Sequence, residues 1–399
     1  MKLQKAGKVQ KNKAGKFSKW LALWVMIVVL LATSLVAWAA PSAPPVTSAA
    51  AVVVMEQSSG RVLHSSNMNA ELYPASTTKI MTALLTLENM ELDDKITLPD
   101  DFINVGETSL GLEPGARQTV EELLMAMMLR SANDAAQALA IGVAGSVEAF
   151  ADMMNEKAAE LGMKHSHFVN PHGLHNSGHY SSAYDLAIVA RAALEHEEFR
   201  RIITTESFTV KKVNGEEDFR VGNRNGLLAR YQYADGIKTG YTRQAGNCFV
   251  SSATRNGMQL IAVVLNSSDI YADAEALLEW GFANYSPTML VDANTVQGEV
   301  TVLNGGRDSI DVLTEKPLYA IAEAGKAVNV QPVIDLPASV AAPVHRGEVI
   351  GSISYTDDNG YTYSTNLLAA RDVGRYTLRL VVRQAFQSVW QVFVVPFTS

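Results

Sequence analysis

The string Ser76-Thr77-Thr78-Lys79 begins a predicted helix directly after Pro74. Residues three apart on a helix share one face, with Cβ atoms about 5–6 Å apart, so the Lys79 amine can reach the Ser76 hydroxyl. A broad apolar face predicts that this helix is buried in the core. That face consists of Ile80, Met81, Leu84, Leu85 and Leu87.

The serine and lysine pair predicts nucleophilic catalysis. A serine hydroxyl is a weak nucleophile until a neighbouring base removes its proton. Lysine serves as that base only where burial or a second cation keeps its amine neutral. At the start of a helix, Ser76 also points its backbone N–H toward the place where an oxyanion would form.

A second string, Ser131-Ala132-Asn133, follows another predicted helix, whose beginning carries the capping-box pair Thr119 and Glu122. The Ser131 hydroxyl can pass a proton between Lys79 and a leaving nitrogen. The Asn133 amide can hold an amide backbone in line for attack. One loop therefore supplies both groups.

A third string, Lys238-Thr239-Gly240, lies on a predicted edge strand. Lys238 brings the second cation that keeps a neighbouring lysine neutral, and together with Thr239 it can bind a free carboxylate. Gly240 leaves room for a peptide to lie alongside the strand by β-augmentation. These features indicate a substrate that ends in a peptide carboxylate.

Each string alone has an ordinary structural interpretation. Ser76 and Ser131 would then cap helices, and Lys238 would be a surface charge. The ordered set S-x-x-K, S-x-N and K-T-G favours the catalytic interpretation, because all three would have to be accidental.

Around these strings the chain resembles the low-molecular-weight penicillin-binding proteins of the serine D-alanyl-D-alanine carboxypeptidase family. The resemblance runs from Ala50 to Ala370. It is carried by Tyr73-Pro74-Ala75-Ser76-Thr77-Thr78-Lys79, Arg130-Ser131-Ala132-Asn133-Asp134-Ala135, Asn170-Pro171-His172-Gly173-Leu174, Asn223-Arg224-Asn225-Gly226-Leu227-Leu228 and Asp235-Gly236-Ile237-Lys238-Thr239-Gly240-Tyr241-Thr242. It implies an α/β (α+β) transpeptidase or β-lactamase-like domain, with an antiparallel sheet flanked by helices, then a small all-β domain and a C-terminal amphipathic segment.

By this resemblance Ser76 is the acylated nucleophile and Lys79 its base. Ser131 is the third catalytic residue, and Asn133 beside it binds the substrate. Ala132 replaces the glycine that is common at this position in the family, a change that removes neither functional side chain.

The same resemblance assigns the substrate carboxylate to Lys238, Thr239 and Gly240, and the second N–H of an oxyanion hole to Tyr241. Arg224 either helps fix Lys238 or the substrate carboxylate, or is a structural arginine in a loop.

The resemblance implies a carboxypeptidase that removes the terminal D-alanine from peptidoglycan pentapeptides through an acyl-enzyme, and that β-lactam antibiotics acylate. A β-lactamase of the same fold is disfavoured, because the sequence lacks the Glu-x-x-Leu-Asn string expected to activate a deacylating water. A DD-endopeptidase and a catalytically inactive wall-binding protein stay open as alternatives.

We expect neither a metal nor another cofactor. The histidines of residues 165–179 have no carboxylate or cysteine at a standard ligand spacing. Cys248 is the only cysteine, so an intrachain disulfide is excluded, and it is expected to be a buried apolar residue. The formal charge is −8, and −15 without the seven lysines of residues 1–19, which argues against nucleic acid as a partner.

Residues 1–40 have the pattern of an export signal, with lysines followed by an uncharged apolar run from Trp20 to Trp38. Ala37-Trp38-Ala39 resembles a cleavage site, although the length of the run leaves an uncleaved membrane anchor open. We expect the protein at the outer face of the bacterial cytoplasmic membrane, in the periplasm or cell-wall space.

The remaining chain divides by pattern into a linker at residues 41–50, a penicillin-binding DD-peptidase domain at residues 51–287 and a β-domain at residues 288–372. The last segment, residues 373–399, favours an amphipathic helix that associates with a membrane surface. Its arginines recur every fourth residue beside a face with tryptophan and phenylalanine, while its valines leave a final strand as the alternative.

Overall fold

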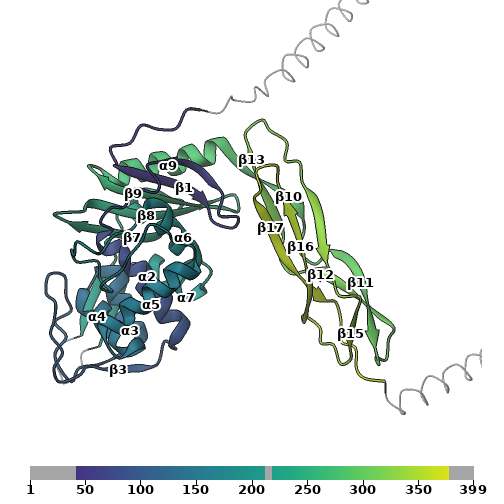
Figure 1. The fold of residues 1–399 in the computed structure, drawn as a ribbon, viewed down its shortest axis with the longest axis horizontal. Coiled ribbons are helices and arrows are strands. Elements are labelled where there is room, and N and C mark those ends of the chain that lie inside the picture. The colour runs from purple at the N-terminus through teal and green to yellow at the C-terminus, as the bar shows by residue number, and fades with distance from the viewer. Residues whose placement is uncertain (1–41, 212–217, 377–399) are drawn as a thin grey trace, which may run out of the picture. The chain divides into compact units, whose positions relative to one another are not determined.

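The computed structural model describes residues 42–211 and 218–376 (Figure 1). The predicted signal at residues 1–40 and almost all of the predicted membrane segment lie outside these residues. Within the described ranges, no helix is both long and apolar enough to cross a bilayer. Ser48, in the predicted linker, donates its hydroxyl to Asp273 at 2.8 Å.

A five-stranded antiparallel sheet in the order β2-β1-β9-β8-β7 forms the centre of the catalytic part. Its strands are β1 (Ala51–Glu56), β2 (Val62–Ser66), β7 (Ala234–Thr242), β8 (Gly246–Arg255) and β9 (Met258–Ser267). The predicted edge strand of Lys238-Thr239-Gly240 is confirmed, because β7 lies at the edge of this sheet.

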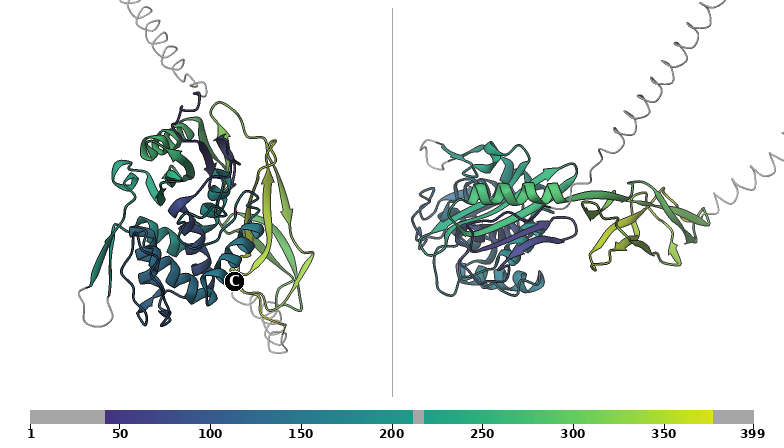
Figure 2. Two further views of the ribbon diagram at one scale, coloured as in Figure 1. Left: turned by 60° about the vertical axis from the view of Figure 1, so that its left-hand side comes forward. Right: turned by 90° about the horizontal axis from the view of Figure 1, so that it is seen from above.

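Both faces of this sheet are covered by helices, so successive residues of a strand enter different cores. Val263 packs into the core shared with the helices α2 and α4, and Val264 into the core shared with α9. Figures 1 and 2 show α9 on one face of the sheet and the helices α2 to α7 grouped on the other. Continuous apolar strands are the consequence.

The helical group contains most of the remaining elements of the catalytic part. They are the 3-10 turn η1 (Ala75–Thr78), α2 (Lys79–Asn89), α3 (Val120–Met125), the π-helical turn η2 (Ala126–Arg130), α4 (Asn133–Ala144), α5 (Val147–Glu160), α6 (Ala183–Ala193) and α7 (Glu197–Thr204). The short helix α8 (Leu227–Arg230) instead packs with α9 through Leu227. Two short hairpins accompany them, β3 (Lys95–Thr97) with β4 (Arg117–Thr119) and β5 (Ser207–Val210) with β6 (Phe219–Gly222).

Helix α9 (Ile270–Asn284) follows the strands β7, β8 and β9. Its buried face includes Ala274, Leu277 and Leu278, whereas Ala276 is exposed. Asp269 caps the helix by accepting a bond from the backbone N–H of Ala272 at 3.1 Å. The cap therefore fixes the start of the helix at Ile270.

A six-stranded sheet in the order β14-β16-β17-β12-β11-β15 builds the C-terminal β-domain, with the pair β10 and β13 beside it. Its strands are β10 (Tyr285–Val291), β11 (Val296–Leu303), β12 (Ser309–Thr314), β13 (Leu318–Glu323), β14 (Gln331–Asp335), β15 (Ser339–Ala341), β16 (Val349–Thr356) and β17 (Thr362–Ala369). Val312, Ile353 and Leu367 lie fully buried in its core. The sequence did not indicate β10 or β15.

Candidate active site

Ser76 lies on η1, the single 3-10 turn that leads into α2. The turn begins at Pro74, whose carbonyl accepts bonds from the backbone N–H and the hydroxyl of Thr77. The sequence predicted one helix from Ser76 onward, whereas the α-helix begins only at Lys79. The tighter turn leaves Ser76 half-buried at the wall of a pocket while Lys79 is fully buried.

The Lys79 amine contacts three oxygen atoms of the site. Its Nζ atom lies 3.1 Å from the Ser76 Oγ atom and donates to the Asn133 Oδ1 atom at 2.8 Å and to the His172 carbonyl at 2.6 Å. Burial, followed by the positive charge of Lys238, holds the pKa of Lys79 well below its usual range. A neutral amine beside the serine can accept its proton.

The second string follows η2, where the capping box at Thr119 and Glu122 begins the preceding helix as predicted. Ser131 takes a left-handed conformation with φ 70° and ends the turn, so its side chain enters the pocket wall. Asn133 begins α4 and donates from its backbone N–H to the Thr108 carbonyl at 2.7 Å. Its side-chain oxygen accepts the bond from Lys79 Nζ at 2.8 Å.

The third string lies on the edge strand β7, next to η1. Lys238 is buried, and its Nζ donates to the Thr239 carbonyl at 2.9 Å. Burial and then the Arg224 charge lower the pKa of Lys238 to about 7. A Cβ atom on Gly240 would lie only 2.8 Å from the Ser76 backbone nitrogen, so β7 approaches the nucleophile turn as closely as a glycine permits.

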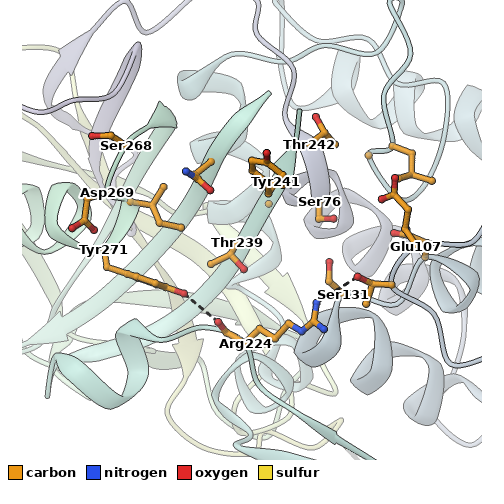
Figure 3. Close-up of a pocket in the computed structure, with 17 residues that line it drawn as sticks. Ser76, Glu107, Ser131, Arg224, Thr239, Tyr241, Thr242, Ser268, Asp269 and Tyr271 are labelled. Atoms are coloured by element: carbon orange, nitrogen blue, oxygen red, sulfur yellow. Dashed lines mark hydrogen bonds between the residues drawn. The ribbon is translucent and has the colours of Figure 1, made fainter. Parts of the chain in front are cut away.

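Arg224 belongs to a loop that is fixed at several points. Its backbone N–H donates to the Leu129 carbonyl, and its own carbonyl accepts a bond from the Tyr271 hydroxyl at 3.2 Å. Its guanidinium lies 3.4 Å from the Thr108 hydroxyl (Figure 3). The cation therefore stands at the pocket wall, close enough to Lys238 to lower the pKa of that lysine.

These elements enclose a pocket of about 610 Å³ (Figure 3). Of the residues that the sequence predicts for the site, the pocket lining includes Ser76, Ser131, Asn133, Arg224, Thr239, Gly240 and Tyr241. Lys79 and Lys238 lie buried behind this lining. The structure thus brings all of the predicted residues to one place.

Other residues of the lining were not predicted from the sequence. They are Glu107, Thr108, Gly173, Leu174, Thr242, Asn247, Ser268, Asp269, Ile270 and Tyr271. Gly173 belongs to a string that the resemblance quotes, but its φ of 80° and its packing against the Ala75 carbonyl emerge only in the fold. Asp134, directly after the second string, could have signalled the loop of Glu107 and Thr108, because a buried acid needs donors.

The histidine-rich segment at residues 165–179 contacts the turn that carries the nucleophile. The ring of His179 bonds to the Thr78 hydroxyl at 2.8 Å through Nε2, and burial lowers the pKa of His179 to about 4. Burial lowers the pKa of His172 to about 3. In the described ranges, no group of three or more histidine, cysteine or acidic side chains is placed to hold a metal ion.

Two family models match this chain. Residues 38–269 match the family model described as D-alanyl-D-alanine carboxypeptidase, and residues 285–375 match the model described as penicillin-binding protein 5, C-terminal domain. The chain is 34% identical over 328 residues to D-alanyl-D-alanine carboxypeptidase DacF of Bacillus subtilis, covering 80% of this chain and 84% of the relative.

Solved structures are similar as well. Penicillin-binding protein 5 of Haemophilus influenzae superposes with a TM-score of 0.62 at 31% identity, covering 84% of this chain and all of the other. Penicillin-binding protein 6B of Escherichia coli gives a TM-score of 0.61 at 28% identity, covering 82% of this chain and 96% of the other.

Proposed function

The chain belongs to the D-alanyl-D-alanine carboxypeptidase family, and from this premise we propose that Ser76 removes the terminal D-alanine of peptidoglycan pentapeptides through an acyl-enzyme. The observation that carries the assignment of Ser76 is the buried Lys79 amine, 3.1 Å from the Ser76 hydroxyl and held neutral by burial and a second cation. The same contacts support the roles that we propose for the other residues of the site.

Substrate binding uses both walls of the pocket. The carboxylate of the terminal D-alanine binds at Lys238, Thr239 and Arg224, and the peptide extends along the free edge of β7. The Asn133 amide, on the opposite wall, holds the peptide backbone in line with Ser76.

Acylation follows from these positions. The Ser76 Oγ atom attacks the carbonyl carbon of the penultimate D-alanine while Lys79 accepts the hydroxyl proton. The backbone N–H groups of Ser76 and Tyr241 stabilise the oxyanion that forms. When the C–N bond breaks, the proton passes from Lys79 through the Ser131 hydroxyl to the nitrogen of the departing D-alanine.

Deacylation reverses the same proton path. Water attacks the ester carbonyl, Lys79 accepts a proton from that water, and the Ser76 oxygen recovers a proton as the shortened peptide leaves. β-Lactam antibiotics present a similar carboxylate and amide carbonyl, so they acylate Ser76 and leave slowly. The similarity to penicillin-binding proteins 5 and 6B supports this expectation.

The decisive experiment combines intact-mass spectrometry with product analysis. Penicillin G should add its full mass to the wild-type chain and should not add to the Ser76→Ala variant. Pentapeptide muropeptides incubated with the wild-type chain should lose one D-alanine. Cleavage of cross-linked dimers without loss of terminal D-alanine would favour a DD-endopeptidase, and rapid penicillin turnover a β-lactamase. A folded wild-type chain that neither forms the adduct nor changes muropeptides would instead be an inactive wall-binding protein.

The site of action is inferred from sequence alone. The export pattern of residues 1–40 and the family substrate support a place outside the cytoplasm, and the arginine pattern of residues 373–399 supports binding to an anionic membrane surface. Cell fractionation of the full chain and of a chain ending at residue 376 tests both. Only the full chain should sediment with membranes once residues 1–40 have been cleaved.

A further inference from the structure

The pocket wall carries one carboxylate that the reaction above leaves unused. Glu107 is exposed in the lining, and its side chain makes no hydrogen bond or ion pair within residues 42–211 and 218–376. The other acid of the lining, Asp269, already caps α9. Within the described residues, Glu107 is therefore the carboxylate of this lining that has no hydrogen-bond or ion-pair partner.

The loop that carries Glu107 is held in place from below. The buried Asp134 carboxylate accepts bonds from the Ser109 hydroxyl at 2.6 Å and from the backbone N–H of Leu110 at 3.0 Å and of Leu112 at 2.9 Å. Glu107 itself takes a left-handed conformation with φ 56°, which a non-glycine residue keeps only where its surroundings fix it. A fixed loop presents a charge at a defined place, unlike an ordinary mobile surface glutamate.

The charges divide the pocket into two ends. Figure 3 shows Arg224 on one side of Ser76, whereas Glu107 and Thr242 lie on the other side. A bound peptide has its carboxylate near Arg224 and lies along β7 from Thr239 to Thr242. The part of the peptide that precedes the carboxylate then extends toward Glu107. The residue before the two D-alanines is the N-terminal neighbour of the attacked alanine. The Cα atoms of these two residues are about 3.8 Å apart. A four-carbon amine side chain on that residue can reach the Glu107 carboxylate.

We propose that Glu107 binds the free ammonium group of the side chain that precedes the D-alanyl-D-alanine pair, so that the enzyme prefers substrates whose diamino acid is not acylated. This inference rests on the function proposed above and names its substrate class. Because the carboxylate is exposed, the preference is modest, about two- to fivefold in kcat/KM, the range of a solvent-exposed ion pair.

The test compares two peptides that differ only in this charge, Nα-acetyl-L-Lys-D-Ala-D-Ala and Nα,Nε-diacetyl-L-Lys-D-Ala-D-Ala. The Glu107 charge also raises the pKa of Lys79, so Glu107→Gln changes the base for both peptides alike. The ratio of the two kcat/KM values removes this shared effect. Glu113→Gln is the matched control, because it removes the same charge from the same loop outside the pocket lining.

We expect the free-amine peptide to lead by about two- to fivefold in the wild type and in Glu113→Gln, and the ratio to fall to about one in Glu107→Gln. The lead should also shrink at high salt, because salt screens exposed charges. Equal kcat/KM values for both peptides in the wild type, or an equal loss on both peptides in Glu107→Gln, would overturn the role of Glu107 while the carboxypeptidase function stands. Failure to hydrolyse either peptide, without a penicillin adduct on Ser76, would instead overturn the function itself.

Discussion

Gly240 on β7 approaches Ser76 so closely that a Cβ atom at position 240 would stand 2.8 Å from the Ser76 backbone nitrogen and 3.0 Å from that of Thr77. The obstacle is backbone, which cannot rotate away as a flexible side chain can. The spacing between the carboxylate-binding strand and the nucleophile turn is therefore set by a glycine.

Gly240→Ala is expected to reduce the second-order rate of penicillin acylation by at least about tenfold, since misplacing a reacting group by about 1 Å costs up to 10²-fold. The Ser76 N–H must move from the oxyanion position to make room for the methyl group. Gly222→Ala provides the control, because a Cβ atom there meets nothing within 4 Å. Equal acylation rates for the two variants would show that β7 and η1 separate without functional cost.

Lys79→Arg is expected to abolish acylation, by about 10²–10⁴-fold, although the charge count is conserved. A guanidinium stays protonated and cannot accept the Ser76 proton, and it does not fit a site shaped around one Nζ atom with three oxygen neighbours. Stopped-flow acylation by a fluorescent penicillin measures the effect. Lys157→Arg, on a surface pair with Glu88 and Glu160, should acylate like the wild type.

The pH dependence of kcat/KM should have two limbs with different origins. On the acid side the rate rises with pH as Lys79 loses its proton, well below the usual range of a lysine. On the alkaline side the rate falls above about pH 7 as Lys238 loses the positive charge that binds the substrate carboxylate.

Arg224→Gln tests the alkaline limb. Removing a nearby positive charge favours the protonated form of Lys238, so its pKa rises and the limb moves to higher pH. Arg220→Gln, which removes an equal charge where the side chain bonds to Ser207, should leave the limb in place. If the alkaline limb did not move in Arg224→Gln, the charge of Arg224 would not influence the pKa of Lys238.

The catalytic groups themselves could be predicted because their chemistry imposes a short local spacing. Ser76 and Lys79 are one helical turn apart, and the capping box at Thr119 marks the helix before Ser131. The edge strand that carries Lys238 was likewise predicted, and it is β7.

The parts that could not be predicted depend on contacts between distant residues. The Lys79 amine bonds to the His172 carbonyl, a backbone atom that no side-chain pattern reveals. Only Val291 of strand β10 is buried, and the strand pairs with β13, so its sequence shows little apolar alternation. The loop of Glu107 has no periodicity, and its shape comes from a single buried carboxylate.

Asp134→Asn is expected to loosen that loop and to lower the free energy of unfolding by about 2–3 kcal/mol, because buried charge-assisted bonds contribute about 1.5–3 kcal/mol each. The amide replaces one acceptor oxygen by an NH₂ group that faces the backbone N–H donors of Leu110 and Leu112. Urea unfolding measures the loss. Asp152→Asn, an exposed change of the same kind on α5, should unfold at the wild-type midpoint.

The same variant should also act on the pocket, since the Thr108 carbonyl and the Asn133 N–H join the loop to the second string. A loosened loop holds Asn133 less firmly, so KM for the peptide should rise by more than kcat falls. If Asp134→Asn unfolded at the wild-type midpoint with an unchanged KM, the loop would be held by its backbone turns alone. Glu107 and Thr108 would then owe their place in the pocket wall to the chain's local geometry rather than to the buried acid.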